Sequence, residues 1–142
     1  MHKTSLNRRI LLAIPLLLAL IVLARLSPSA GAATITVNTT QDTIDNRGDC
    51  SLREAIIAVN ENRVVDGCSG DKGENAIMLP PGTYVFKLAG SGEDDAQTGD
   101  LDITGDLTLN GDGHADTIIK GAPLDRVFHL LGCAVTISDV TI

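Results

Sequence analysis

The amino-acid sequence predicts an all-β fold in the form of a β-solenoid. The 142 residues include no Trp, one Tyr and two Phe, so the core must be built from Ile, Val and Leu, a composition that favours stacked strands. No segment of useful length with helical period separates the expected strands, which excludes the helical crossovers of an ordinary parallel sheet. Short strands are expected at 76–79, 83–88, 101–103, 107–109, 117–120, 126–131, 135–137 and 140–142.

The turns between these strands separate two architectures, an antiparallel sandwich and a solenoid. Single Gly, Asp or Asn residues divide the strands, and the segment from Asp102 to Leu109 reads as two strands that meet at a bend. A hairpin needs a turn that folds the chain back, whereas a solenoid needs bends between the flat sheets of one coil. The bends therefore favour the solenoid, in which each coil buries its apolar residues on the next.

The N-terminal residues 1–32 have the pattern of a signal peptide. Basic residues precede an uncharged, Leu-rich run at 10–24, and small residues of the A-x-A type end at Ala32. An uncleaved membrane anchor is the alternative, but the run is shorter than the roughly 20 residues of a bilayer span, and Pro15 interrupts it. We expect cleavage after Ala32 and a protein that is secreted or held at the cell surface.

The charge of the chain excludes one class of partner. Removing residues 1–32 takes away four of the eleven Lys and Arg residues and none of the eighteen acidic residues, which leaves a net charge of −11. A surface this acidic repels nucleic acid. We therefore expect no nucleic-acid partner.

The segment 33–75 is expected to contain a first strand at 34–38, a polar loop and a short amphipathic helix. Ser51 and Glu54 have the S-x-x-E spacing of a capping box, and apolar residues then recur at helical spacing up to Asn60. Arg53 and Glu54 could be read as a catalytic ion pair, yet capping and an exposed helix face explain both positions better.

The cysteines indicate an oxidising compartment. Cys50 and Cys68 flank the expected helix and a polar loop, and we expect them to form a disulfide after export. Cys133 lies in an apolar stretch, where a small buried side chain is the simpler interpretation.

Several motifs together resemble a known family. The run CSLREAI at 50–56, followed by Ala58 and Asn60, is similar to the CSLREA segment that opens many secreted proteins with right-handed parallel β-helix repeats. The similarity extends to the segments at 77–84, 99–103 and 125–128.

The resemblance implies a right-handed parallel β-helix, of which this chain would be the N-terminal portion, with the short helix covering its end. Residues 33–75 would form the opening strand, capping helix and disulfide loop, and residues 76–142 the first coils. Since such proteins continue into many repeats, we expect a truncated chain whose partners include further β-helix coils of a longer parent. The resemblance implies no reaction and no catalytic residues.

A calcium site is a further hypothesis. Asp100 and Asp102 would point to the same side of an extended segment, roughly 7 Å apart, so they could share a calcium ion. Solvated turn aspartates are the alternative. His114 and His129 stand apart in the sequence without a partner motif, so the sequence assigns neither as a metal ligand. No other cofactor is expected.

The function expected from these features is that of a scaffold, an adhesin or a binding stalk, with a cell-surface or glycan ligand. The alternative is the N-terminal part of a polysaccharide lyase or hydrolase of the parallel β-helix type. Such enzymes need aromatic faces for sugar stacking, and Tyr84, Phe86 and Phe128 each lie in an apolar run that is expected to pack inside. The sequence therefore favours a chain that is not itself an enzyme.

Overall fold

The computed structural model describes residues 33–71, 73–121 and 126–142. The expected signal peptide lies outside these residues. Within the described part of the chain, no helix is both long enough and apolar enough to cross a membrane. The elements, in chain order, are β1 (Thr34–Thr36), α2 (Leu52–Glu61), β2 (Val64–Val65), β3 (Cys68–Ser69), β4 (Asn75–Met78), β5 (Gly82–Val85), β6 (Leu101–Ile103), β7 (Leu107–Asn110), β8 (Thr117–Lys120), β9 (Phe128–Leu130) and β10 (Val135–Ser138).

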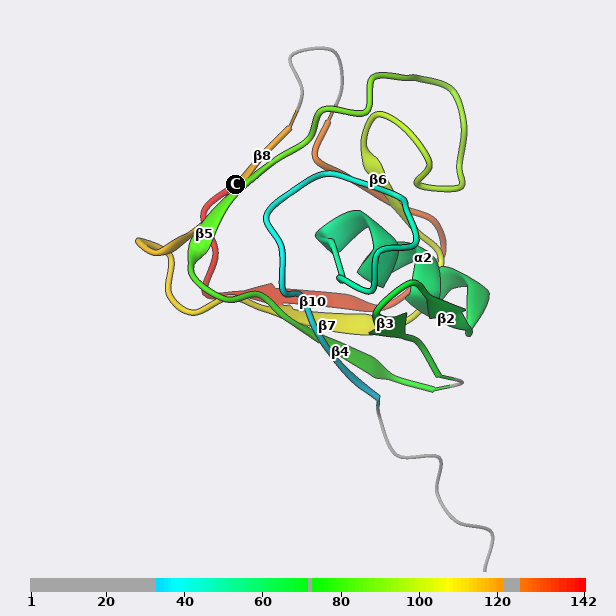
Figure 1. Cartoon of the computed structure of the whole chain (residues 1–142), viewed down its shortest axis with the longest axis horizontal. Coiled ribbons are helices and arrows are strands. Elements are labelled where there is room, and N and C mark those ends of the chain that lie inside the picture. Colours follow the sequence, from blue (N-terminus) through cyan, green and yellow to red (C-terminus); the bar gives the residue numbers. More distant parts are fainter. Residues whose placement is uncertain (1–32, 72, 122–125) are drawn as a thin grey trace, which may run out of the picture.

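The strands form four separate small sheets. The largest has the order β1-β4-β7-β10, and all of its neighbouring strands are parallel. Two further parallel pairs, β5 with β8 and β6 with β9, lie on the other sides of the molecule, while β2 and β3 form a short antiparallel pair (Figure 1). In each parallel pair the partner strands are far apart in the sequence, so long connections rather than hairpins join them.

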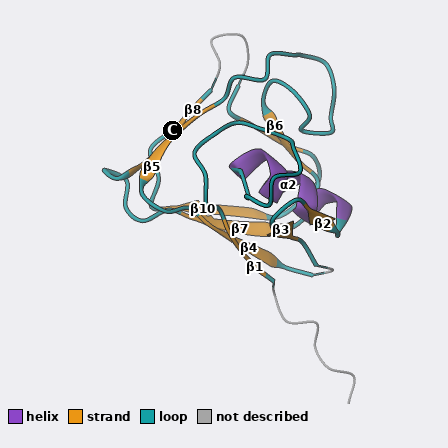
Figure 2. Ribbon diagram, in the orientation of Figure 1, coloured by secondary structure: helices purple, strands orange, loops and turns teal. Residues whose placement is uncertain are grey.

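The predicted all-β, right-handed parallel β-helix is wrong for this structure. The described strands contain only two to four residues each and are divided among separate sheets, one of them antiparallel. A ten-residue helix also contributes eight buried residues to the interior (Figure 2). Bends and short strands can be read from a sequence, but they do not fix how the strands are shared among sheets. Within the described residues, the fold is therefore one helix combined with small, mainly parallel sheets.

Helix α2 begins with a complete capping box. Ser51 Oγ accepts a hydrogen bond from the Glu54 amide, and Glu54 Oε2 accepts one from the Ser51 amide. The helix ends at Asn62, whose left-handed backbone (φ 50°) lets its amide donate to carbonyls of the last turn. The expected exposed face of this helix is absent, since all residues from Leu52 to Val59 are buried. Arg53 and Glu54 are among them.

The core forms where α2 meets the strands. The helix packs against β2, β3 and β6. Asn60, in its last turn, fastens it to the end of β6: its Nδ2 donates to the Asp102 carbonyl at 2.7 Å, and its Oδ1 accepts from the Thr104 amide at 2.9 Å. The apolar interior is built mainly from Ile, Leu and Val. Burial of these side chains provides the main driving force for folding.

The predicted disulfide is confirmed. Cys50 and Cys68 are bonded, with their Cα atoms 5.0 Å apart, and both are buried. The bond joins the residue before the helix cap to strand β3, so it closes the helix and the β2–β3 pair into one unit. Cys133 is a free thiol of intermediate exposure, and its Sγ donates to the Ile103 carbonyl.

Candidate functional site

A cluster of ionisable side chains lies where β6 and β9 run side by side. The register of this parallel pair places Asp102 directly beside His129. Asp102 Oδ1 lies 2.8 Å from His129 Nδ1, and the Asp102 side chain is completely buried. The loop before β6 adds Asp94, whose Oδ1 is 3.7 Å from the same nitrogen. No local pattern predicts this contact, because 27 residues separate Asp102 from His129.

The second predicted calcium ligand, Asp100, is part of the same cluster but faces another partner. Arg126 Nε donates to Asp100 Oδ2 at 2.5 Å. The Asp100 side chain is 5% exposed, whereas that of Arg126 is 54% exposed, so the guanidinium approaches the buried carboxylate from the solvent side. Asp100 and Asp102 therefore each contact a different basic side chain.

The carboxyl group of Asp102 is held in an environment that favours its protonated form. Burial raises the pKa of Asp102, and the neighbouring charges of Asp100 and Glu93 raise it as well. Hydrogen bonds from His129 and from the Ala96 amide act in the opposite direction, but the pKa remains above the usual value. A carboxyl group of raised pKa beside an imidazole is the kind of pair that binds protons or cations.

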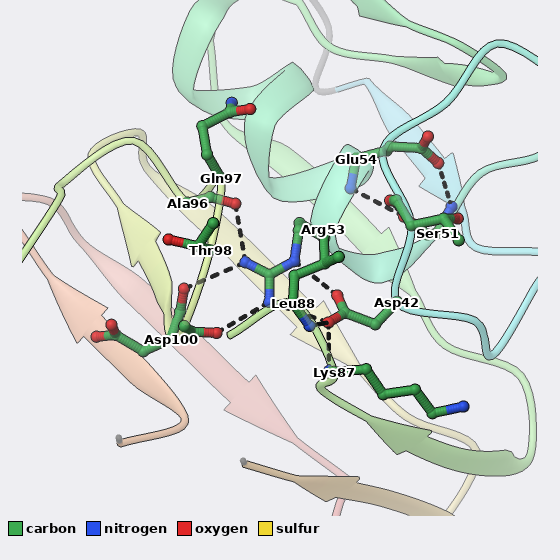
Figure 3. A network of polar contacts seen from close by, with 12 residues as sticks. Asp42, Ser51, Arg53, Glu54, Lys87, Leu88, Ala96, Gln97, Thr98 and Asp100 are labelled. Carbon is green, nitrogen blue, oxygen red and sulfur yellow. Dashed lines mark hydrogen bonds and ion pairs between the residues drawn. The ribbon is translucent and has the colours of Figure 1, made fainter. Parts of the chain in front are cut away.

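A second network surrounds Arg53 and is wholly internal (Figure 3). Arg53 Nε donates to Asp42 Oδ1 at 2.6 Å, and Nη2 donates to Asp42 Oδ2 at 3.3 Å. The remaining guanidinium hydrogens reach the carbonyls of Ala96 and Gly99, both at 2.9 Å, and the carbonyl of Asp100 at 3.4 Å. The Phe86 ring lies 5.4 Å from the guanidinium carbon, a cation–π distance. The N–H groups of this buried guanidinium therefore all have hydrogen-bond acceptors, and its carbon lies near an aromatic ring.

Asp42 completes this network from the loop that follows β1. Although burial raises the pKa of Asp42, the hydrogen bond from Arg53 and the backbone hydrogen bonds from Leu88 and Lys87 bring it below the usual value. The amides of Lys87 and Leu88 donate to Asp42 Oδ2 at 2.6 and 2.9 Å. Asp42 was not predicted as a partner, because Arg53 was expected on an exposed helix face; a buried Arg requires a carboxylate partner.

A third group of carboxylates fastens the loop before the helix. Asp45, Asp49 and Asp66 each bring an oxygen within 4.8 Å of the others. Asp66 Oδ1 accepts from the Gly48 amide at 2.8 Å, and Asp66 Oδ2 accepts from the Arg47 amide at 3.1 Å. These bonds link the loop to the segment before Cys68 and give Asp66 a structural role, whereas Asp49 Oδ1 is buried and has no hydrogen-bond partner among the described residues.

The aromatic side chains pack inside the protein, as expected from the sequence. Tyr84 is 3% exposed and Phe86 is 4% exposed, while Phe128 is partly buried against the core. A hollow of about 100 Å³ opens beside Tyr84, between Asn38 and Pro80. Its volume is below the roughly 300–1,000 Å³ of typical small-molecule sites.

Comparison of the chain with protein-family models, with characterised proteins and with solved structures found no match.

Proposed function

We propose that the chain is an exported structural module that serves as a scaffold, an adhesin or a binding stalk, and that it is not an enzyme. This proposal rests mainly on the structural roles of the side chains in segment 50–54. This segment is the part of the sequence that looks most like a functional motif. Cys50 forms a disulfide, Ser51 and Glu54 cap the helix, and Arg53 forms a buried ion pair. All four side chains serve folding, and none is presented to a substrate.

The disulfide supports a location outside the cytoplasm. Such bonds persist in oxidising compartments and are rare where thiols are kept reduced. The net charge of −7 for the whole chain agrees with a soluble, self-repelling surface. Export is therefore the natural setting for this fold.

Open strand edges support a role in assembly or binding. β10 is an end strand of the four-stranded sheet, and β9 pairs with one other strand of the described part, whereas β8 pairs with β5 and is also bridged to Thr141. Apolar side chains near these strands, Val127, Val135 and Ile137 among them, are only partly buried. Strand edges with adjoining apolar side chains are suited to pairing with an added strand.

The polysaccharide-acting alternative receives little support from the described residues. Sugar rings are usually gripped by stacking on aromatic faces, and the rings of Tyr84 and Phe86 are turned into the core. A buried carboxyl group beside an imidazole, as in the Asp102–His129 pair, is an arrangement that enzymes use. If the chain had a catalytic activity, that activity would depend on this pair.

Secretion of the full chain from a bacterial host, followed by fractionation and assay on a panel of polysaccharides, tests the proposal. We expect the processed protein outside the cytoplasm and no turnover of any glycan. Turnover that disappears in a His129→Gln variant would show an enzyme instead. Cytoplasmic retention of a folded, unprocessed chain would contradict export.

A further inference from the structure

The side chains at the β6–β9 junction form a preorganised set of ligands. Asp102 and His129 are direct neighbours in the parallel register, so the backbone of the two strands fixes their separation. The Ala96 amide lies 3.3 Å from Asp102 Oδ2 and donates to it, which leaves Oδ1 directed at the imidazole. A hydrogen bond to the second oxygen of a carboxylate is a common way to orient a metal ligand.

His129 Nδ1 has three polar neighbours. Nδ1 lies 2.8 Å from Asp102 Oδ1, 3.7 Å from Asp94 Oδ1 and 3.4 Å from Arg126 Nη2. A guanidinium only donates, so the contact with Arg126 requires a lone pair on Nδ1, whereas an ionised Asp102 requires a proton there. If the nitrogen carries its lone pair, that lone pair can accept from a protonated Asp102 or bind a cation that lies between it and the carboxylate oxygens.

We propose that Asp94, Asp102 and His129 bind one divalent transition-metal ion, with Zn²⁺ as the best fit. The three ligand atoms lie within 4.8 Å of one another. Zn²⁺ binds imidazole nitrogen and carboxylate oxygen at about 2.0–2.2 Å, which places neighbouring ligand atoms roughly 3.0–3.6 Å apart. The two measured separations, 2.8 and 3.7 Å, lie on either side of this range, so small side-chain shifts suffice.

The donor set favours zinc over the calcium ion that the sequence suggested. Calcium prefers six to eight oxygen ligands, and a nitrogen ligand suits zinc much better. The Asp94 side chain is 72% exposed and that of His129 is 28% exposed, so the ion has a path from solvent and a water molecule can complete its coordination. The site does not depend on the proposed structural function, and failure of either would leave the other standing.

The charges around the site also favour a cation. Asp94 and Asp102 are the two carboxylate ligands. The negative charges of Asp100 and Glu93 also interact with Asp102. Arg126 is the opposing charge, but it is bound to Asp100 and its side chain is more than half exposed, so solvent screens its effect on the ion.

Titration of the exported full chain with Zn²⁺, after removal of metals with a chelator, tests this site. A Cys133→Ser background excludes binding by the free thiol. We expect one ion per chain, with affinity at least about tenfold lower in His129→Gln and in Asp94→Asn. The matched controls His114→Gln and Asp95→Asn should bind as the parent does. Because Asp94 is exposed, its variant will report on binding even if a substitution at Asp102 impairs folding.

Substitution with Co²⁺ gives a second readout. Visible absorption bands of a bound cobalt ion should appear in the parent and be lost in His129→Gln. Either of two results would overturn the proposal: no binding at micromolar Zn²⁺, or binding that is unchanged in both His129→Gln and Asp94→Asn. Calcium binding at the same residues with no zinc binding would also overturn it.

Discussion

Arg53 and Asp42 form an ion pair inside the molecule, with side chains that are 0% and 2% exposed. The two residues come from different elements, Arg53 from the first turn of α2 and Asp42 from the loop that follows β1. The guanidinium also bonds carbonyls in the segment before β6, so one side chain ties three parts of the chain together.

Breaking the buried pair should strongly destabilise the fold. Asp42→Asn leaves the Arg53 charge buried without an ionised partner, and we expect the free energy of unfolding to fall by about 3–5 kcal/mol in urea denaturation. Arg47→Met is a suitable control, because Arg47 pairs with Asp45 at the surface with an 81% exposed side chain. That substitution should cost less than about 1 kcal/mol. Equal losses in the two variants would show that burial of the pair is unimportant.

Stability should also depend on pH through Asp42. The pKa of Asp42 is lowered in the folded state, so its contribution is present above the ordinary value near 4 and is lost as pH falls through the lower folded pKa. Asp102 has a raised pKa and acts in the opposite sense, because its contribution is lost as pH rises through the folded pKa.

Urea denaturation of the parent and of Asp42→Asn, between pH 3 and pH 7, isolates the contribution of Asp42. The gap in stability between the two proteins should narrow as the solution is acidified. A gap that stays constant down to pH 3 would mean that Asp42 titrates alike in the folded and unfolded states.

The open edge of β10 should promote association between copies of the chain. Thr136 lies on this edge strand, is exposed, and is paired in register with Thr108 of β7. Thr136→Lys places a charge on the edge, where like charges from two copies would meet, and should weaken self-association on the order of a few-fold. Sedimentation of the exported, processed protein measures this effect.

Thr108→Lys provides the matched comparison for the edge. It puts the same charge on a strand whose neighbours on both sides, β4 and β10, are already in place. The substitution at Thr108 should therefore change association less than the one at Thr136. An equal effect of the two would point to general charge repulsion rather than edge pairing.

Local features of this protein could be predicted from the sequence, whereas its long-range pairings could not. The S-x-x-E spacing of Ser51 and Glu54 contains the whole capping box, and β6 lies at 101–103, where a short strand was expected. The fold class was wrong, since short strands and bends do not specify how strands are divided among sheets. The expected exposed face of the helix was wrong because the segments around Asp42 and Ala96 cover Arg53.

The contacts of the candidate site could not be predicted from the sequence either. Asp102 was identified as an acidic ligand, but its partner His129 becomes its neighbour only through the register of β6 and β9. That register depends on the length and course of the chain between the two strands. No local pattern of residues contains this information.

Thiol trapping of the exported protein is the most direct test of an extracytoplasmic, disulfide-bonded structural module. The chain would be secreted, treated with an alkylating reagent without reduction, and examined by mass spectrometry. We predict that Cys50 and Cys68 remain linked and unmodified in protein recovered outside the cytoplasm. A folded protein recovered from the cytoplasm with both cysteines alkylated would contradict the proposed module.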